Sequence, residues 1–312
     1  MTTELPLISV ITPSLNQGMY IEDNIRSVLN QHYPNFEHIV IDGGSTDGSV
    51  DILAKYNHLI WVSEEDTGQS EAINKGLKSA NGEIIGWLNS DDCYEPHAFS
   101  TIVQELNEGE GRYIVFGDCN VINEGGKRIG YCKGRLTDPE KFIKYWEKNY
   151  TIPQPAVFFR RDILQTVGFL DEDLHYVMDY DFWLRVSKHY RIHYIRKPLA
   201  KMRVHNRAKS SLTYELFERE WFKVLKKCRG DLFWLDYYRY LLMAFNFRSN
   251  LMRMNAYSEM GALSLKDFRK KIIFSIVYNP FNIFRRKFAS ALLRAILGHQ
   301  HLNRIKYLLQ KP

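Results

Sequence analysis

The stretch that decides the fold is "EIIGWLNSDD", residues 83–92. An apolar run from Ile84 to Leu88 ends abruptly, and two adjacent carboxylates, Asp91 and Asp92, follow it. Short apolar runs with β-branched residues are typical of buried strands in a parallel sheet. Two neighbouring like charges repel unless they are separated, solvated or neutralised. Because a bound cation would neutralise them, we expect a ligand site at this strand end.

The residues before this stretch repeat the same organisation. Strands are predicted at 7–12, 37–42, 59–64 and 83–89, and the first and the last of them are expected to be buried. Helices are predicted around 21–29, 49–56 and 69–79. Strands that alternate with helices predict an α/β fold with a mainly parallel central sheet flanked by helices, and ligands bind outside the carboxyl ends of such strands. Each predicted strand ends in polar residues: Thr12-Pro13-Ser14, Asp42-Gly43-Gly44, Ser63 to Asp66, and Asn89 to Asp92.

Composition and charge narrow the class of protein. The 312 residues are 45% hydrophobic and 25% charged, which is typical of a globular chain with a sizeable core. The net charge of +6 is mild, and no nucleic-acid recognition motif is present, so we expect no nucleic-acid partner. None of the four cysteines forms a CxxC pair. We find no secretory signal and no apolar run of about 20 residues, so the expected location is the cytoplasm.

The rest of the chain changes character near residue 210. Residues 111–210 mix strand-like and helical segments and complete a first domain, 1–210. Residues 211–312 are predicted to be mainly helical, aromatic and basic, with apolar segments at 233–247 and 270–298 flanked by Lys and Arg. Such segments either lie in a membrane interface or pack on the catalytic domain or a second subunit. Peripheral contact with the inner face of the cell membrane is therefore one of two expectations, and the oligomeric state is not readable.

The turn from Asp42 to Gly48 lies between a predicted strand and a predicted helix. Its glycines allow close approach of a ligand to the backbone, and N–H groups at a helix start attract phosphate. Asp42 is a candidate for binding a base or ribose. The alternative is a tight turn with Asp47 as helix N-cap. The order of residues fits neither a GxGxxG fingerprint nor a Walker loop.

Three further groups of residues are chemical candidates. Asp91 is the better candidate ligand for Mg²⁺ or Mn²⁺, whereas Asp92 is suited to cap the next helix, with Pro96 near its first turn. Asp179, in "VMDYDFWLR", is a candidate base because aromatic surroundings raise a carboxyl pKa. Asp181 is expected to pair with Arg185, one helical turn away. Near His205 lies a cationic patch that could face a diphosphate, formed by Arg203, Arg207 and Lys209.

Several segments together resemble the family 2 glycosyltransferases with the GT-A fold, over about residues 7–210. They are "ISVITPSLNQGMYIEDNIRSVLNQHYPNFEHIVIDGGSTDGS", "TGQSEAINKGLKSANGEIIGWLNSDD", "QPAVFFRRDIL" and "MDYDFWLR". The resemblance implies an inverting transfer of a sugar from a nucleotide-diphosphate sugar to a hydroxyl group, with Mn²⁺ or Mg²⁺ as cofactor. UDP is the expected nucleotide, a hexose or N-acetylhexosamine the expected sugar, and a glycan or lipid-linked glycan the expected acceptor, in bacterial surface-polysaccharide synthesis such as that of O-antigen.

The resemblance also assigns residues. Asp179 matches the catalytic base, and Asp91 matches the last carboxylate of the Asp-x-Asp metal motif, with His205 as a further metal ligand. The residues expected at the nucleotide are Thr12, Pro13, Ser14, Asn16, Asp42, Gly43, Ser45, Gln69, Asn74, Asn89 and Ser90. Those expected at the diphosphate or the acceptor are Arg203, Asp181 and Gln154. The sequence departs from the family pattern where Asn89, Gly43 and Met178 replace acidic residues, and the neutral Asn89 is expected to reduce metal affinity.

Other functions remain open from the residues alone. A sugar-nucleotide nucleotidyltransferase would normally carry basic residues in the loop after the first strand, which here is "TPSLNQGMY". A non-catalytic nucleotide-sugar or glycan-binding protein would have no need of Asp91 and Asp179. A glycoside hydrolase would use paired carboxylates, and the nucleotide-type turn at Asp42 argues against it.

Overall fold

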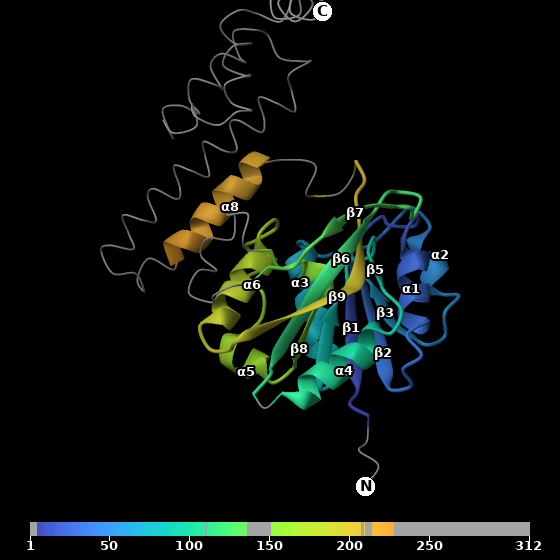
Figure 1. Cartoon of the computed structure of the whole chain (residues 1–312). Helices are drawn as coiled ribbons and strands as arrows, with labels where there is room; N and C mark the ends of the chain where they lie inside the picture. Colours follow the sequence, from blue (N-terminus) through green and yellow to red (C-terminus); the bar gives the residue numbers. More distant parts are fainter. Residues whose placement is uncertain (1–4, 110, 136–150, 207–208, 210–213, 228–312) are drawn as a thin grey trace, which may run out of the picture. The chain divides into compact units, whose positions relative to one another are not determined.

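A computed structural model of the chain describes residues 5–109, 111–135, 151–206, 209 and 214–227. The chain divides into two compact units, residues 1–220 and 221–312. The first unit contains one mixed sheet with helices packed against it (Figure 1). The predicted apolar segments 233–247 and 270–298 lie outside the described residues. Within the described residues, no helix combines the length and the apolar character needed to cross a bilayer.

The elements follow the predicted alternation closely in the first hundred residues. In this part they are β1 (Ile8–Ser14), α1 (Ile21–Leu29), β2 (Phe36–Asp42), α2 (Ser49–Leu53), β3 (Leu59–Ser63), α3 (Gln69–Ser79) and β4 (Ile84–Trp87). The elements that follow are β5 (Cys93–Tyr94), α4 (Ala98–Glu108), β6 (Ile114–Ile122), β7 (Arg128–Cys132), the 3₁₀ turn η2 (Gln154–Ala156), β8 (Val157–Arg160), α5 (Ile163–Val167), α6 (Met178–Ser187), β9 (Ile192–Arg203) and α8 (Tyr214–Lys227).

The sheet has a parallel half and a mixed half. Its strand order is β3-β2-β1-β4-β8-β6-β9-β5, with β7 paired to β6. The first four strands are parallel to one another, as predicted. β8 joins β4 and β6 in antiparallel fashion, while β6 and β9 are parallel. The predicted α/β class is confirmed, and antiparallel strands extend the parallel part.

Tight packing fixes α3 on the sheet. A side chain at Gly76 of α3 would lie 2.4 Å from Cγ2 of Ile11 in β1, so only glycine allows this approach. Ala72, Ile73 and Leu77 of the same helix are buried. On the facing strands, the central residues of β1 and β2 are also buried. Burial of aliphatic side chains stabilises such contacts by about 25 cal/mol per Å² of apolar surface. The amino terminus of α3, with Gln69, is thereby held at the carboxyl ends of the strands.

A second core lies around α4 and the middle of the sheet. Tyr94 stacks on Phe158 with ring centroids 5.0 Å apart, and Phe99 of α4 meets both rings edge-on. Gly86 of β4 makes room for this cluster, because a side chain there would lie 2.4 Å from the Tyr94 hydroxyl oxygen. Figure 1 shows α4 lying across the sheet near β8 and β9. This aromatic packing fixes the strand that leads to Asn89 and Asp91.

Candidate active site

The carboxyl ends of the parallel strands meet at one edge, as the sequence predicted. Ser14, Asp42 and Ser63 are direct neighbours in register across β1, β2 and β3. β4 joins the same edge, since the Leu88 N–H donates to the carbonyl of Ile11 in β1. The polar residues that follow these strands are therefore gathered on one side of the sheet.

The turn after β2 is built around the Asp42 carboxylate. Asp42 is fully buried, and its oxygens accept hydrogen bonds from the Ser45 N–H at 2.8 Å, the Ser45 hydroxyl at 2.5 Å and the Ser63 hydroxyl at 2.7 Å. The Gly43 N–H donates to the Ser14 carbonyl. Because a buried carboxylate needs such donors, Asp42 holds the turn in one conformation.

The loop after β1 is tied to this turn. Asn16 has a positive φ of 53°, its N–H donates to the Ser45 hydroxyl at 2.7 Å, and its Oδ1 accepts the Thr46 N–H at 2.9 Å. Asp47 accepts the N–H groups of Gly18 and Ser49, but the N-cap of α2 is Gly48, so Asp47 is not the N-cap that the alternative predicted. Pro13 and Ser14 complete the buried end of β1. The predicted nucleotide loops thus form one connected unit.

Asn89 is a hub at the end of β4. Its Oδ1 accepts hydrogen bonds from Gln69 Nε2 at 2.8 Å and Trp87 Nε1 at 3.0 Å. Its Nδ2 donates to Gln154 Oε1 at 3.2 Å, and Gln154 Nε2 donates to the Trp87 carbonyl. Its carbonyl accepts the Asn24 side-chain amide. Three residues predicted for the site, Gln69, Asn89 and Gln154, are therefore in direct contact.

Asp91 and His205 face each other across the same edge. Asp91 Oδ2 lies 3.0 Å from His205 Nε2. The His205 side chain is 1% exposed and the Asp91 side chain 20% exposed. Ser90, between Asn89 and Asp91, is buried. The sequence proposed both Asp91 and His205 as metal ligands, and the fold brings them together.

The Asp91–His205 pair fits a divalent cation in part. Ligands bind Mg²⁺ at about 2.0–2.1 Å with octahedral geometry, which places neighbouring ligands about 3 Å apart. Oxygen and imidazole nitrogen are both accepted by Mn²⁺. Among the described residues, no group of three His, Cys, Asp or Glu side chains could hold a metal. The remaining ligands would have to come from substrate phosphate and water, which is the usual arrangement for Mg²⁺.

Asp92 has a structural role that differs from helix capping. It is buried, and its Oδ1 accepts the Arg203 N–H at 2.8 Å. Helix α4 begins only at Ala98, after β5. Burial, and then the charge of Asp91, raise the pKa of Asp92 well above its usual value. The two adjacent carboxylates of the opening stretch are thus separated, because Asp92 turns inward and Asp91 faces His205.

The predicted position of Arg203 at the diphosphate does not fit the structure. Its side chain is 1% exposed, and its N–H groups donate to the carbonyls of Asp91, Asn123 and Glu124 and to the Asp23 carboxylate. A guanidinium has five N–H donors, and this one directs them at the protein. Arg203 therefore fixes the loop that carries Asp91.

Three other site predictions are corrected in the same way. Thr12 is buried, and its hydroxyl lies 2.9 Å from His38 Nε2 in the core. Asn74 is buried, and its side chain bonds the Leu170 backbone and Glu172. Asp181 is buried and pairs with Arg185 at 2.9 Å, which is the alternative that the helical spacing predicted. In the structure these three side chains are buried and bond protein groups.

Asp179 is the second residue of α6 and is partly buried. Burial raises its pKa to about 6, although the Tyr180 N–H, which donates to Oδ1 at 2.8 Å, acts in the opposite direction. A carboxylate with such a pKa is ionised at neutral pH and is more basic than an ordinary aspartate. The arrangement suits proton removal from a hydroxyl group.

Lys209 connects the Asn89 hub to the segment before Asp179. Its Nζ donates to Gln69 Oε1 at 3.0 Å and to the His175 carbonyl at 3.4 Å. The pKa of Lys209 is lowered, because desolvation outweighs the charges of Glu220 and Asp66, which act in the opposite direction. A chain of hydrogen bonds thus runs from the end of β4 to a point four residues before Asp179.

Sequence reasoning missed Asn24. Its amide donates to the carbonyls of Asn89 and Asp92 and so fixes the turn between them. One signal was present, since Asn24 lies on the same helical face as Ile21, Ile25 and Val28, where a polar residue is unexpected.

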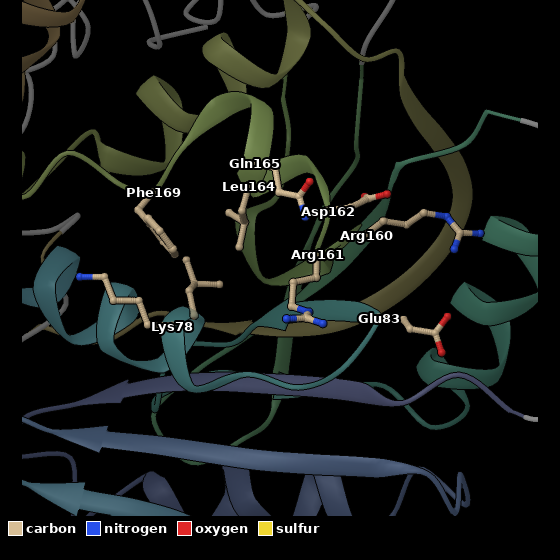
Figure 2. Close-up of a pocket in the computed structure, with 9 residues that line it drawn as sticks. Lys78, Glu83, Arg160, Arg161, Asp162, Leu164, Gln165 and Phe169 are labelled. Carbon is tan, nitrogen blue, oxygen red and sulfur yellow. The ribbon is translucent and has the colours of Figure 1, made fainter.

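A pocket of about 530 Å³ lies away from this site. Figure 2 shows its charged lining residues Lys78, Glu83, Arg160, Arg161 and Asp162. Arg160 pairs in register with Ile84, at the start of β4, whereas Asn89 and Asp91 follow the other end of that strand. The Arg160 guanidinium donates to the carbonyls of Leu106 and Arg112. This pocket therefore does not belong to the candidate active site.

Known proteins resemble this chain in sequence and in fold. A profile described as Glycosyl transferase family 2 matches residues 9–168, just over half of the chain. A putative teichuronic acid biosynthesis glycosyltransferase of Bacillus subtilis, TuaG, is 30% identical over 237 residues, which cover 71% of this chain and 88% of TuaG. An uncharacterized glycosyltransferase of Rickettsia typhi is 29% identical over 238 residues, covering 72% of this chain and 73% of the relative.

Solved structures show the same fold. S. aureus TarS 1-349 in complex with UDP-GlcNAc has a TM-score of 0.62 at 18% identity, covering 93% of this chain and 88% of that chain. The mannosyltransferase PcManGT from Pyrobaculum calidifontis, in complex with GDP-Man and Mn²⁺, has a TM-score of 0.57 at 17% identity, covering 95% of this chain and 89% of that chain. The predicted GT-A fold is confirmed, and the chain belongs to glycosyl transferase family 2.

Proposed function

We propose that the protein transfers a hexose or N-acetylhexosamine from a nucleotide-diphosphate sugar to a hydroxyl of a glycan or lipid-linked glycan, with inversion at the anomeric carbon. UDP is the first nucleotide to test, and surface-polysaccharide synthesis is the proposed setting. The observation that carries the proposal is the set of hydrogen bonds from Asn89 through Gln69 and Lys209 to His175, because it joins the Asp91 edge to the segment that bears Asp179.

The proposed donor site lies at the carboxyl edge of β1, β2 and β4. The interlocked loops around Asn16, Asp42 and Ser45 offer a rigid wall for the nucleoside. Asn89 and Gln69 lie beside it. TarS was solved with UDP-GlcNAc and PcManGT with GDP-Man, which supports a nucleotide sugar as donor without choosing the nucleotide.

Asp91 and His205 would hold Mn²⁺ or Mg²⁺ together with the donor diphosphate. When bound, the ion supplies positive charge to the leaving diphosphate. Asn89 is directed at Gln69, Trp87 and Gln154, so it is not proposed as a ligand. The complex of PcManGT with Mn²⁺ supports a divalent ion in this fold.

In the proposed mechanism, Asp179 takes the proton of the acceptor hydroxyl as that oxygen attacks the anomeric carbon. The bond from this carbon to the diphosphate oxygen breaks, and its electron pair leaves with the diphosphate. Attack from the opposite face inverts the configuration. Lys209, at Gln69, would lie near the developing negative charge. General base catalysis of this kind is worth about 10²–10⁴-fold in rate.

The proposed location is the cytoplasmic face of the cell membrane. A lipid-linked acceptor would be reached there, and the basic, apolar segments in 211–312 are the proposed peripheral contact. TuaG, a putative teichuronic acid biosynthesis enzyme by its description, supports the proposed role in surface polymers.

A panel of nucleotide sugars tests the proposal. UDP-glucose, UDP-galactose, UDP-N-acetylglucosamine, UDP-N-acetylgalactosamine, GDP-mannose and dTDP-glucose would each be added with and without Mn²⁺, and the Tm measured. Binding at 100 times Kd stabilises the folded state by about 2.7 kcal/mol. A shift for one nucleotide, larger with Mn²⁺, is expected. A flat panel would contradict the proposed donor class.

A further inference from the structure

Glu220 of α8 binds three consecutive backbone N–H groups. Its carboxylate accepts hydrogen bonds from His175 at 2.9 and 3.0 Å, from Tyr176 at 2.7 Å and from Val177 at 3.3 Å. Glu220 is only 7% exposed. Backbone N–H groups that converge in this way form a concave site for an anion. Here the anion is a side chain supplied from 43 or more residues further along the chain.

The segment that Glu220 holds leads directly into α6. Val177 caps this helix without a side-chain hydrogen bond, and the first helical bond runs from the Asp181 N–H to the Val177 carbonyl. Asp179 lies two residues after the last N–H that Glu220 accepts. The direction in which α6 starts, and hence the position of the Asp179 carboxylate, depends on the conformation of residues 175–177.

The other side of this segment is fixed by α3. The Ser70 hydroxyl donates to the Leu174 carbonyl at 2.5 Å, and Asn74 exchanges two hydrogen bonds with the Leu170 backbone. His175 lies so close to Gly68 that a side chain there would meet its Nδ1 at 2.7 Å. Since α3 is packed on the sheet, residues 170–174 have a rigid support, and Glu220 fixes residues 175–177, the three that remain before the helix.

We propose that Glu220 is a positioning residue for Asp179. It touches no substrate; it holds residues 175–177 so that the Asp179 carboxylate meets the acceptor hydroxyl in a reactive geometry. The inference rests on the proposed role of Asp179 as base. Displacement of a reacting group by about 1 Å is enough to lower a rate by up to about 100-fold, so loss of this support is expected to reduce turnover without weakening the donor site.

The carboxylate suits this task better than a neutral group. A charged acceptor forms hydrogen bonds about twice as strong as a neutral one. Oε2 accepts all three N–H groups, whereas Oε1 accepts only that of His175. Glutamine can place its single oxygen at the Oε2 position, so Glu220→Gln should retain part of the effect that Glu220→Ala loses.

The test uses the full-length chain and four variants: Glu220→Ala, Glu220→Gln, Asp179→Asn and the control Arg219→Ala. Arg219 is the exposed neighbour of Glu220 on the same helix. Two quantities are measured. One is amide hydrogen exchange at residues 175–177. The other is the rate at which nucleotide diphosphate is released in the presence of Mn²⁺, with water as the acceptor. The donor is the nucleotide sugar that stabilises the protein most, and the rate is divided by the fraction of protein molecules that bind it.

We expect faster exchange at residues 175–177 in Glu220→Ala and a rate per donor-binding molecule at least about tenfold lower, with donor Kd unchanged. Glu220→Gln should lie between Glu220→Ala and wild type, and Arg219→Ala should match wild type. If Glu220→Ala does not fold, the same two readouts in Glu220→Gln decide.

The inference would be overturned if amide exchange at residues 175–177 in Glu220→Ala matched wild type. It would also be overturned if that exchange were faster but the rate of nucleotide diphosphate release stayed at the wild-type value. The two proposals fail separately. A wild-type rate in Asp179→Asn would remove Asp179 as base, whereas loss of rate in Asp179→Asn together with a wild-type rate in Glu220→Ala would remove only the role of Glu220.

Discussion

Asp91 Oδ2 lies 3.0 Å from His205 Nε2, although 114 residues separate them in the chain. The contact depends on β9, which ends at Arg203 and returns the chain to the carboxyl edge of the sheet. The backbone N–H of Arg203 donates to Asp92, and its guanidinium to the carbonyl of Asp91. A strand end and a distant loop therefore form a single candidate metal site.

The first prediction concerns this pair. Asp91→Asn and His205→Gln should each raise the Mn²⁺ concentration needed for half-maximal activity at least about tenfold, since loss even of outer-shell partners costs 10–100-fold in metal affinity. Activity should be lost in excess chelator and recover with Mn²⁺ or Mg²⁺. Mn²⁺ titration of donor turnover checks this result.

Asp162→Asn is a suitable control for the metal prediction, because Asp162 is exposed and lines the pocket beyond the other end of β4. This variant should need the same Mn²⁺ concentration for half-maximal activity as wild type. Full activity of the wild-type enzyme in excess chelator would remove the metal from the proposed mechanism.

The second prediction concerns pH. Burial raises the pKa of Asp179 to about 6, and the base must be ionised to accept a proton. At saturating donor and Mn²⁺, kcat should therefore be flat above about pH 7, fall to half near pH 6 and then decline about tenfold per pH unit. A plateau that extends to pH 4.5 would exclude a base with this pKa.

The third prediction concerns stability. The pKa of Asp179 is about 6 in the folded chain and about 3.9 when unfolded, so the ionised form is disfavoured by folding, and stability is lost as pH rises from about 4 to 6. Asp179→Asn removes this loss. It should raise the free energy of unfolding by at most about 3 kcal/mol at pH 7 and by nothing near pH 3.5. Denaturant unfolding at both pH values measures the difference; an equal effect at both would be inconsistent with this cause.

The fourth prediction concerns Arg203. Its buried guanidinium bonds Asp23 and three backbone carbonyls, so Arg203→Lys should lower the free energy of unfolding by about 2 kcal/mol and Arg203→Ala by about 3–5 kcal/mol. Arg196→Lys, at an exposed position of the same strand, is the control. If Arg203→Lys retains wild-type stability but loses donor affinity, Arg203 faces the diphosphate after all.

Sequence pattern predicted the parallel half of the sheet well. The apolar runs that end at Ser14, Asp42 and Trp87 are buried strands, and their short length, β-branched residues and flanking turn residues identify them. The mixed half of the sheet was harder to predict from the sequence, because β8 and β9 pair with strands far away in the chain. No local signal specifies such pairing.

The sequence predicted the site from residue types, and residue type does not tell in which direction a side chain points. Thr12, at 0% exposure, and Arg203, at 4%, were both expected at the ligand, yet both side chains are buried and bond other parts of the protein. A hydroxyl or a guanidinium has the same sequence signature whether it bonds a phosphate or a buried carbonyl. Glu220 is the opposite case, a buried residue with a structural role that the sequence did not indicate. Nothing in "FEREWF" distinguishes a buried carboxylate from a solvated one.

The most direct measurement of the central claim is the turnover of Asp179→Asn, together with its donor affinity. The substitution keeps the size of the side chain but removes its negative charge, and with it the ability to accept a proton. The account predicts that kcat falls at least about 100-fold while the donor Kd in Mn²⁺ stays within about threefold, which is less than 1 kcal/mol. A near-normal kcat with intact donor binding would contradict it.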